Sequence, residues 1–152
     1  MFFFTATINS WKHLLEPDEI KLIIIDSLNW LHKNNRAPIN WFVLMPNHIH
    51  LLWHSKEDYS QANIEFTLLS YTAHQFKTYL KNNNLSVLNQ YKATQNDREY
   101  HFWERRSWSI EVLSLRIAEQ KLDYIHENPC KEKWGLAEQP TDYFYSSARF
   151  YE

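Results

Sequence analysis

The chain has 152 residues and a formal net charge of −2, with 16 Lys and Arg against 18 Asp and Glu. Hydrophobic residues make up 44% and aromatic residues 16%, which is typical of a folded protein and excludes a disordered chain. The single glycine, Gly135, excludes glycine-rich phosphate loops and with them a P-loop or dinucleotide-binding fold. The length predicts one domain over residues 1–152.

Cysteine usage and hydropathy indicate where the protein works. Cys130 is the only cysteine, so a disulfide framework is excluded and a reducing cytosol is favoured. No apolar run approaches the roughly 18 residues of a membrane span. The start, MFFFTATI, lacks the basic residues and the long apolar stretch of a signal peptide. We therefore expect a cytoplasmic protein with no membrane partner.

The first part of the chain predicts a strand, a helix and a hairpin. Residues 2–8 are aromatic and β-branched, which favours a strand. Residues 17–35 begin with proline and acidic residues and continue with apolar residues at helical spacing. The buried face of that helix should hold Leu22, Ile25, Leu28, Trp30 and Leu31. The apolar runs 37–45 and 48–54 flank the turn pair Pro46–Asn47 and should form an antiparallel hairpin.

The second part predicts two further helices with a strand between them. A helix is expected from about Ala62 to Leu80, followed by a long polar loop over residues 82–98. Residues 100–112 read as a bent strand, and a third helix should run from an N-cap at Ser114 to a stop at Pro129. This order of elements predicts an α+β fold, a ferredoxin-like antiparallel sheet with helices on one face.

Three histidines alternate along one predicted strand, namely His48, His50 and His54. Alternate residues of a strand share a face, so these side chains point away from Ile49 and Leu51. Two neutral imidazoles about 7 Å apart along a strand can bind one ion. Such a pair is about as often two ordinary part-buried histidines as it is a metal site, so a third ligand nearby has to decide between the two interpretations. His54 lies further along and is interpreted as a bystander.

The third predicted helix offers a candidate partner for the histidines. Its apolar residues form one stripe, made of Leu115, Ala118, Leu122 and Ile125. Tyr124 and Asn128 are four residues apart and therefore share another face, turned away from that stripe. A phenol beside an amide, brought near two histidines, would give a metal site with a nucleophile next to it. The alternative is that Tyr124 packs with its hydroxyl in water and Asn128 caps the helix.

Three segments in order resemble one protein family: PNHIHLL (46–52), FWERR (102–106) and DYIHENP (123–129). Together they are similar to the single-tyrosine HUH transposases, and in particular to the REP-associated tyrosine transposases and other small single-strand DNA transposases of insertion sequences. The three segments in order are far more specific than PNHIHLL alone, and the resemblance covers most of the chain. It implies a ferredoxin-like sheet whose central strand carries the histidine pair.

The resemblance also implies a reaction, which is metal-dependent nicking of single-stranded DNA at hairpin-associated sites followed by strand transfer. Carried over to this chain, His48 and His50 are metal ligands and Tyr124 is the nucleophile that forms a 5′-phosphotyrosine link. Asn128 is the third ligand, where some relatives carry glutamine, and His126 is a weaker candidate that should point elsewhere. The implied cofactor is Mg²⁺ or Mn²⁺, of which Mn²⁺ suits imidazole ligands better.

The expected partner is single-stranded DNA that forms a hairpin. Cationic and aromatic side chains would contact it: Lys77, Lys81, Arg105, Arg106, Arg116, Lys131 and Lys133 at phosphates, and Trp103 and Trp108 at bases. The net charge of −2 predicts modest non-specific affinity with steep salt dependence. Whether Tyr124 serves its own histidine pair or that of a partner in a homodimer stays open. The target sequence stays open as well.

Three alternatives accompany this hypothesis. Tyr71 precedes Gln75 by four residues, as Tyr124 precedes Asn128, and is the rival nucleophile, although it lies in an apolar stretch outside the three segments. A non-catalytic nucleic-acid-binding module of ferredoxin-like fold would use the histidines only for stacking or phosphate contact. A metal-dependent hydrolase or oxygenase would need a further ligand, for which His126 and Glu127 are the nearby candidates.

Overall fold

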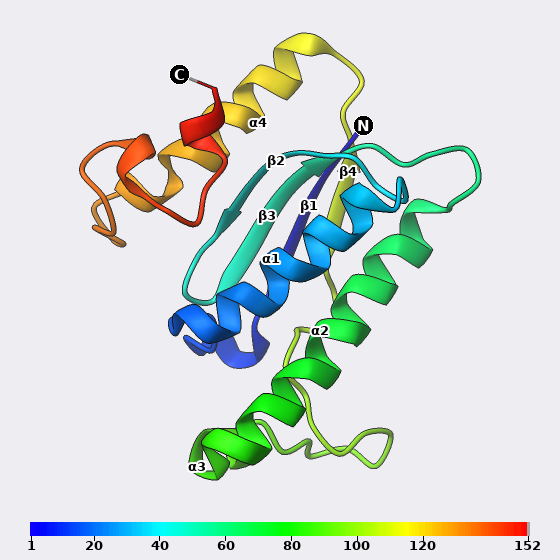
Figure 1. The fold of residues 1–152 in the computed structure, drawn as a ribbon, viewed down its shortest axis with the longest axis vertical. Helices are drawn as coiled ribbons and strands as arrows, with labels where there is room; N and C mark the ends of the chain where they lie inside the picture. Colours follow the sequence, from blue (N-terminus) through cyan, green and yellow to red (C-terminus); the bar gives the residue numbers. More distant parts are fainter. Residues whose placement is uncertain (152) are drawn as a thin grey trace.

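A computed structural model describes residues 1–151, and its elements follow the expected order (Figure 1). The strands are β1 (Phe2–Thr7), β2 (Ile39–Leu44), β3 (His48–Trp53) and β4 (Trp108–Glu111). The α-helices are α1 (Asp18–Lys33), α2 (Gln61–Asn83), α3 (Leu85–Asn89) and α4 (Leu115–Glu127). Short 3₁₀ turns, η1 to η4, cover Asn9–Trp11, Asn128–Cys130, Pro140–Asp142 and Ala148–Phe150.

The four strands form one antiparallel sheet in the order β2-β3-β1-β4. Strand β3 is therefore central, paired with β2 through the expected hairpin and with β1 on its other side. In the β1–β3 register Thr5 lies opposite His50 and Thr7 lies opposite His48. The sheet confirms the predicted fold class and places the histidine pair in its middle.

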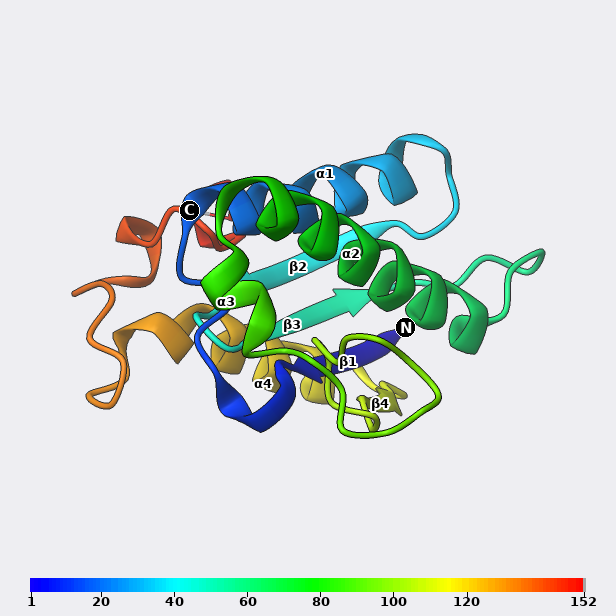
Figure 2. The same ribbon diagram turned by 90° about the horizontal axis from the view of Figure 1, so that it is seen from below.

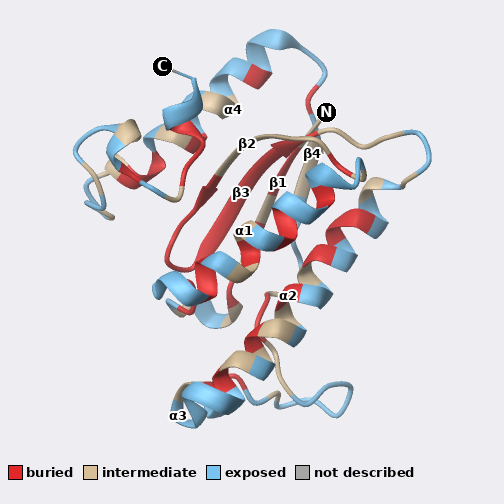
Figure 3. Ribbon diagram, viewed as in Figure 1, coloured by how far each residue is buried: buried red, intermediate tan, exposed pale blue. Residues whose placement is uncertain are grey.

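Helices cover both faces of this sheet, as Figure 2 shows, with α1 and α2 on one side and α4 on the other. Ile49, Leu51 and Trp53 of β3 belong to the core beneath α1 and α2. Leu52 belongs to a second core, shared with Ala118 and Ile125 of α4. The expectation that helices lie on one face holds for α1 and α2, whereas α4 packs on the face that carries the histidines. All six residues of β3 are buried as a result (Figure 3).

Local capping explains where helices α2 and α4 begin. The Ser60 hydroxyl accepts a hydrogen bond from the backbone N–H of Asn63 at the start of α2. The Ser114 hydroxyl accepts one from Ile117 at the start of α4, so the predicted N-cap is confirmed. Helix α4 ends at Glu127, two residues before Pro129, and the chain continues as the 3₁₀ turn Asn128–Cys130, so the expected stop at Pro129 is confirmed.

The buried face of α1 differs from the predicted one. Leu22 and Trp30 are 47% and 54% exposed, while Lys21 and Ser27 are buried. Apolar residues surround most of this helix, so periodicity alone does not single out one face. The two buried polar groups are satisfied locally, because Lys21 Nζ donates to the carbonyl of Glu16 at 2.6 Å and the Ser27 hydroxyl bonds to a carbonyl of α1.

Two further predictions need correction. The strand expected over residues 100–112 is present only as β4, and upstream of it Tyr100 and Trp103 make single bridges to Lys92 and Ile8. The intervening Glu-Arg-Arg run is polar and leaves the sheet at this point. The polar loop after α2 contains the short helix α3. Within the described residues, no helix combines the length and the apolar character that a membrane crossing requires.

Candidate metal and tyrosine site

The histidine pair lies on the α4 side of the central strand. His48 and His50 are 6% and 5% exposed, and their ring centroids are 4.7 Å apart. Burial, assisted by the charges of Lys133 and Lys131, lowers the pKa of His48 to about 4. Burial also lowers the pKa of His50 to about 2, assisted by His48 and the same lysines. Both imidazoles are therefore neutral at pH 7, the form that binds metal ions.

Each imidazole is hydrogen-bonded through Nδ1 to a neighbouring side chain. His48 Nδ1 lies 2.7 Å from Asn47 Oδ1, and His50 Nδ1 lies 2.7 Å from Thr5 Oγ1. The Nε2 atoms are thereby left for another partner. His50 Nε2 is buried and has no hydrogen-bond partner among the described residues, and such an orphaned atom in a packed interior calls for an explanation.

Helix α4 brings the other two candidates to the pair. Asn128 is 2% exposed, and its Nδ2 lies 3.3 Å from His48 Nε2. The Tyr124 ring is 40% exposed, and its centroid lies 5.1 Å from that of His50. Tyr124 and Asn128 therefore face the histidines, although helical spacing had placed them away from the packed stripe. That stripe is shorter than predicted, because Leu115 is 75% exposed.

The donor set fits a divalent cation. It offers two imidazole Nε2 atoms, one of them orphaned, and a carboxamide that carries an oxygen. Within residues 1–151 no three His, Cys, Asp or Glu side chains are grouped to hold an ion. The side chain beside the histidine pair that carries a further oxygen is the amide of Asn128. Imidazoles fixed through Nδ1 are the usual arrangement at metal sites.

Two lysines and a tryptophan complete the surroundings of Tyr124. Lys131 Nζ lies 3.9 Å from the centre of the Tyr124 ring. Lys121 Nζ lies 4.6 Å from the Phe3 ring, 5.5 Å from the Trp108 ring and 5.9 Å from the Tyr124 ring. Lys121 was not singled out from the sequence as a neighbour of Tyr124. Its position three residues before Tyr124 on the same helix could have indicated that the two side chains lie close together.

The fold was compared with known proteins. No family model and no curated protein matches the sequence. Among solved structures, a REP-associated tyrosine transposase bound to a REP hairpin aligns with a TM-score of 0.66 and 19% identity, over 98% of this chain and 76% of the other. A Deinococcus radiodurans R1 protein assigned as a transposase aligns with a TM-score of 0.52 and 18% identity, over 90% of this chain and 92% of the other. The chain has the fold of these transposases.

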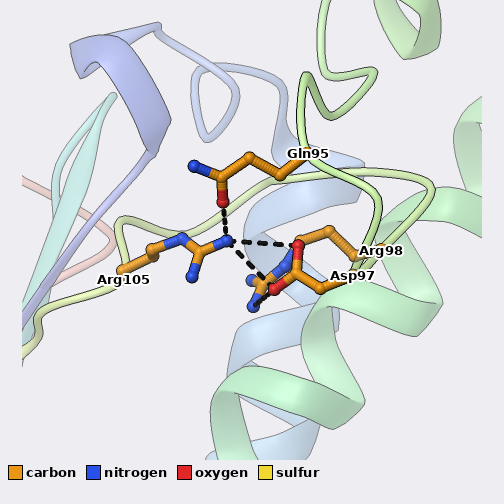
Figure 4. A network of polar contacts seen from close by, with 4 residues as sticks. All are labelled: Gln95, Asp97, Arg98 and Arg105. Carbon is orange, nitrogen blue, oxygen red and sulfur yellow. Dashed lines mark hydrogen bonds and ion pairs between the residues drawn. The ribbon is translucent and has the colours of Figure 1, made fainter.

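On this transposase fold, the cations predicted for DNA contact lie in different places. Lys131 lies at the site, whereas Lys77 and Lys81 are on α2, across the sheet, and Lys77 is paired with Glu99. Arg105 is held by Gln95 and Asp97 in a surface network, with an Arg–Asp distance of 3.0 Å (Figure 4). The remaining three predicted cations are exposed, namely Arg106, Arg116 and Lys133.

The prediction for Trp103 does not hold. Its side chain is 6% exposed in the core under α2, and its indole N–H donates to Thr72 Oγ1 at 3.0 Å. A ring enclosed in this way cannot stack on a base. Trp108 is 53% exposed, and its ring meets that of Phe3 edge to face at 5.9 Å beside Tyr124. Of the two tryptophans predicted to contact bases, Trp108 is therefore the exposed one.

The rival candidates lie away from the histidine pair. Tyr71 and Gln75 line a cavity of about 590 Å³ between α1 and α2, on the opposite face of the sheet. His126 Nε2 is 2.9 Å from the hydroxyl of Ser147, so it points elsewhere as expected. Glu127 is exposed. Neither His126 nor Glu127 supplies the further ligand that a hydrolase or oxygenase of the His-x-His type would need.

Proposed function

We propose that the chain is a metal-dependent endonuclease and strand transferase that acts on single-stranded DNA at hairpin-associated sites. One observation carries the proposal: a single chain gathers a tyrosine, two neutral imidazoles and an amide. The Tyr124 ring lies 5.1 Å from that of His50, and Asn128 Nδ2 lies 3.3 Å from His48 Nε2. All four side chains belong to one chain, which supports a site in which Tyr124 serves its own histidine pair.

The ion would be held by His48 and His50 through Nε2 and by Asn128 through Oδ1. Rotation of the carboxamide by 180° exchanges its nitrogen for its oxygen, so the amide can present the oxygen that a cation requires. A bound divalent cation would offset the charge of the phosphate and make its phosphorus more electrophilic. Nitrogen-rich ligation favours Mn²⁺, while Mg²⁺ remains a candidate in the cell.

Tyr124 supplies the nucleophile in this proposal. Its phenolic oxygen attacks the phosphorus of a DNA phosphodiester, the bond from phosphorus to the 3′ oxygen breaks, and a 5′-phosphotyrosine and a free 3′-hydroxyl result. The phenolic proton can pass to water, because the side chain is 40% exposed, and the departing 3′ oxygen takes up a proton from water. Attack by the 3′-hydroxyl of another strand reverses the step, releases Tyr124 and joins the strands without an external energy source.

The substrate class follows from the surroundings of Tyr124. Lys121 and Lys131 place two positive charges over its ring, where they can neutralise phosphates although the net charge of the chain is −2. Trp108 offers an exposed ring on which an unpaired base can stack. The solved structure of a REP-associated tyrosine transposase is bound to a REP hairpin, which supports a hairpin-forming substrate here.

The test uses a panel of hairpin oligonucleotides with single-stranded flanks, labelled at either the 5′ or the 3′ end. We expect Mn²⁺-dependent cleavage by the wild-type protein, with the fragment downstream of the nick retained by protein on a denaturing gel. His50→Ala and Tyr124→Phe should abolish cleavage, and Tyr71→Phe, the matched control on the opposite face, should leave it unchanged. Binding without cleavage of any oligonucleotide would instead favour the non-catalytic module.

A further inference from the structure

Asn47 lies between His48 and the turn η1 near the start of the chain. It is 5% exposed, its Nδ2 donates to the carbonyl of Trp11 at 3.2 Å, and its Oδ1 lies 2.7 Å from His48 Nδ1. The carbonyl of Trp11 can only accept, so it fixes which end of the amide faces His48. The amide oxygen can also only accept, so His48 Nδ1 carries the proton and His48 Nε2 carries the lone pair.

The turn that supplies this carbonyl is strained. Ser10 and Trp11 have φ angles of 58° and 56°, a region that residues other than glycine rarely adopt. The turn is held by the Ser10 N–H, which donates to Glu104 Oε1 at 2.7 Å, and by the Trp11 N–H, which donates to the carbonyl of Ile8 at 2.9 Å. The Trp11 side chain is 65% exposed, so burial of its ring does not account for the strain.

We propose that Asn47 is a positioning residue for the ion site. Together with the carbonyl of Trp11, it fixes His48 in the tautomer whose Nε2 can bind a divalent cation. The inference rests on the proposed function, because it concerns the same pair of imidazoles. Thr5 makes the corresponding contact to His50, through Oγ1 at 2.7 Å from Nδ1, from the opposing position on β1. Groups that orient a metal-binding histidine typically change metal affinity by about 10- to 100-fold.

The chain contains a matched control for this contact. His54, on the same histidine-rich segment, has its Nδ1 2.7 Å from Asn40 Oδ1, the same kind of bond at the same distance. His54 does not belong to the pair. Asn40→Ala therefore removes an equivalent asparagine–histidine hydrogen bond without touching His48 or Asn47.

The first experiment measures Mn²⁺ affinity by isothermal titration calorimetry. We expect Asn47→Ala to weaken binding by about 10- to 100-fold, and Asn40→Ala to leave the affinity at the wild-type value. Asn47→Asp keeps an acceptor for His48 Nδ1 but loses the donor to the carbonyl of Trp11, so it should recover only part of the affinity. Circular dichroism confirms that each variant is folded. Wild-type affinity in a folded Asn47→Ala protein would overturn the inference.

The second experiment needs no metal and separates this inference from the proposed function. Long-range ¹⁵N–¹H correlation spectra of the metal-free protein report which imidazole nitrogen carries the proton. We expect His48 to be protonated on Nδ1 in the wild type and in Asn40→Ala, and to populate both tautomers in Asn47→Ala. A wild-type His48 protonated on Nε2 would refute the role of Asn47. Failure of the wild type to bind Mn²⁺ would refute the proposed function, and the spectra would still decide the tautomer.

Discussion

Acid should destabilise the metal-free protein through its buried histidine pair. Burial lowers the pKa of His48 from 6.5 to about 4 and that of His50 from 6.5 to about 2. Between about pH 4 and pH 6.5 the folded protein keeps both imidazoles neutral, while in the unfolded chain each of the two imidazoles binds a proton. Because the unfolded state then binds more protons, the free energy of unfolding falls as the pH is lowered. The loss begins near pH 6.5 and ends only below the folded pKa values.

The expected loss is large enough to measure. Within this window, each histidine lowers the free energy of unfolding by about 1.4 kcal/mol for every unit by which the pH falls. From pH 8 to pH 5 the pair together should lower the free energy of unfolding by about 4 kcal/mol, on the order of half the stability of an ordinary domain. Most carboxylates stay ionised above pH 5, so this window isolates the histidines from general acid denaturation.

Urea unfolding followed by tryptophan fluorescence, between pH 5 and pH 8 in EDTA, measures the effect. The double variant His48→Gln, His50→Leu is the comparison, because it removes both titrating groups from the site. Its free energy of unfolding should change much less with pH than that of the wild type. Equal pH dependence of the two proteins would refute the argument that buried, neutral imidazoles control acid stability. Added Mn²⁺ should protect only the wild type, since the ion competes with protons.

Three further predictions concern the DNA surface and the core. Trp108→Leu should weaken single-strand binding by about 10-fold in fluorescence anisotropy, whereas Trp30→Leu, equally exposed across the sheet, should not; equal effects would refute the stacking role. Lys121→Gln should reduce the slope of log affinity against log salt by about 1, and Lys81→Gln should leave it unchanged; the reverse order would contradict the assignment. Thr72→Val strands an indole N–H in the core and should cost about 1–3 kcal/mol in urea unfolding, unlike Thr72→Ser, which keeps the hydroxyl.

Local patterns predicted the hairpin and the alternation of β3, because strand period and turn residues are properties of a few adjacent positions. Local patterns did not predict which residues along a helix are buried against the sheet. Leu115 and Ile125 belong to the same predicted stripe of α4, yet Leu115 is 75% exposed and Ile125 is fully buried. The angle and position of α4 on the sheet decide this, and helical period carries no information about either.

For the site too, features set by residues close in sequence could be predicted, whereas contacts between distant segments could not. The histidine pair and the spacing of Tyr124 and Asn128 could be read from adjacent residues. Thr5 contacts His50 only through the β1–β3 register, which couples positions 45 residues apart in sequence. Likewise, the sequence pattern does not distinguish Trp103 from Trp108. Trp103 pairs with Ile8, just after β1, and is buried in the core, whereas Trp108 is exposed.

Mass spectrometry of the reaction mixture tests directly whether Tyr124 becomes linked to DNA. The wild-type protein is incubated with Mn²⁺ and a cleavable hairpin oligonucleotide, denatured, treated with nuclease and digested with protease. We expect a nucleotide adduct on the peptide that contains Tyr124, and no such adduct in the His50→Ala protein. An adduct on Tyr71, or complete cleavage without any protein-linked nucleotide, would contradict it.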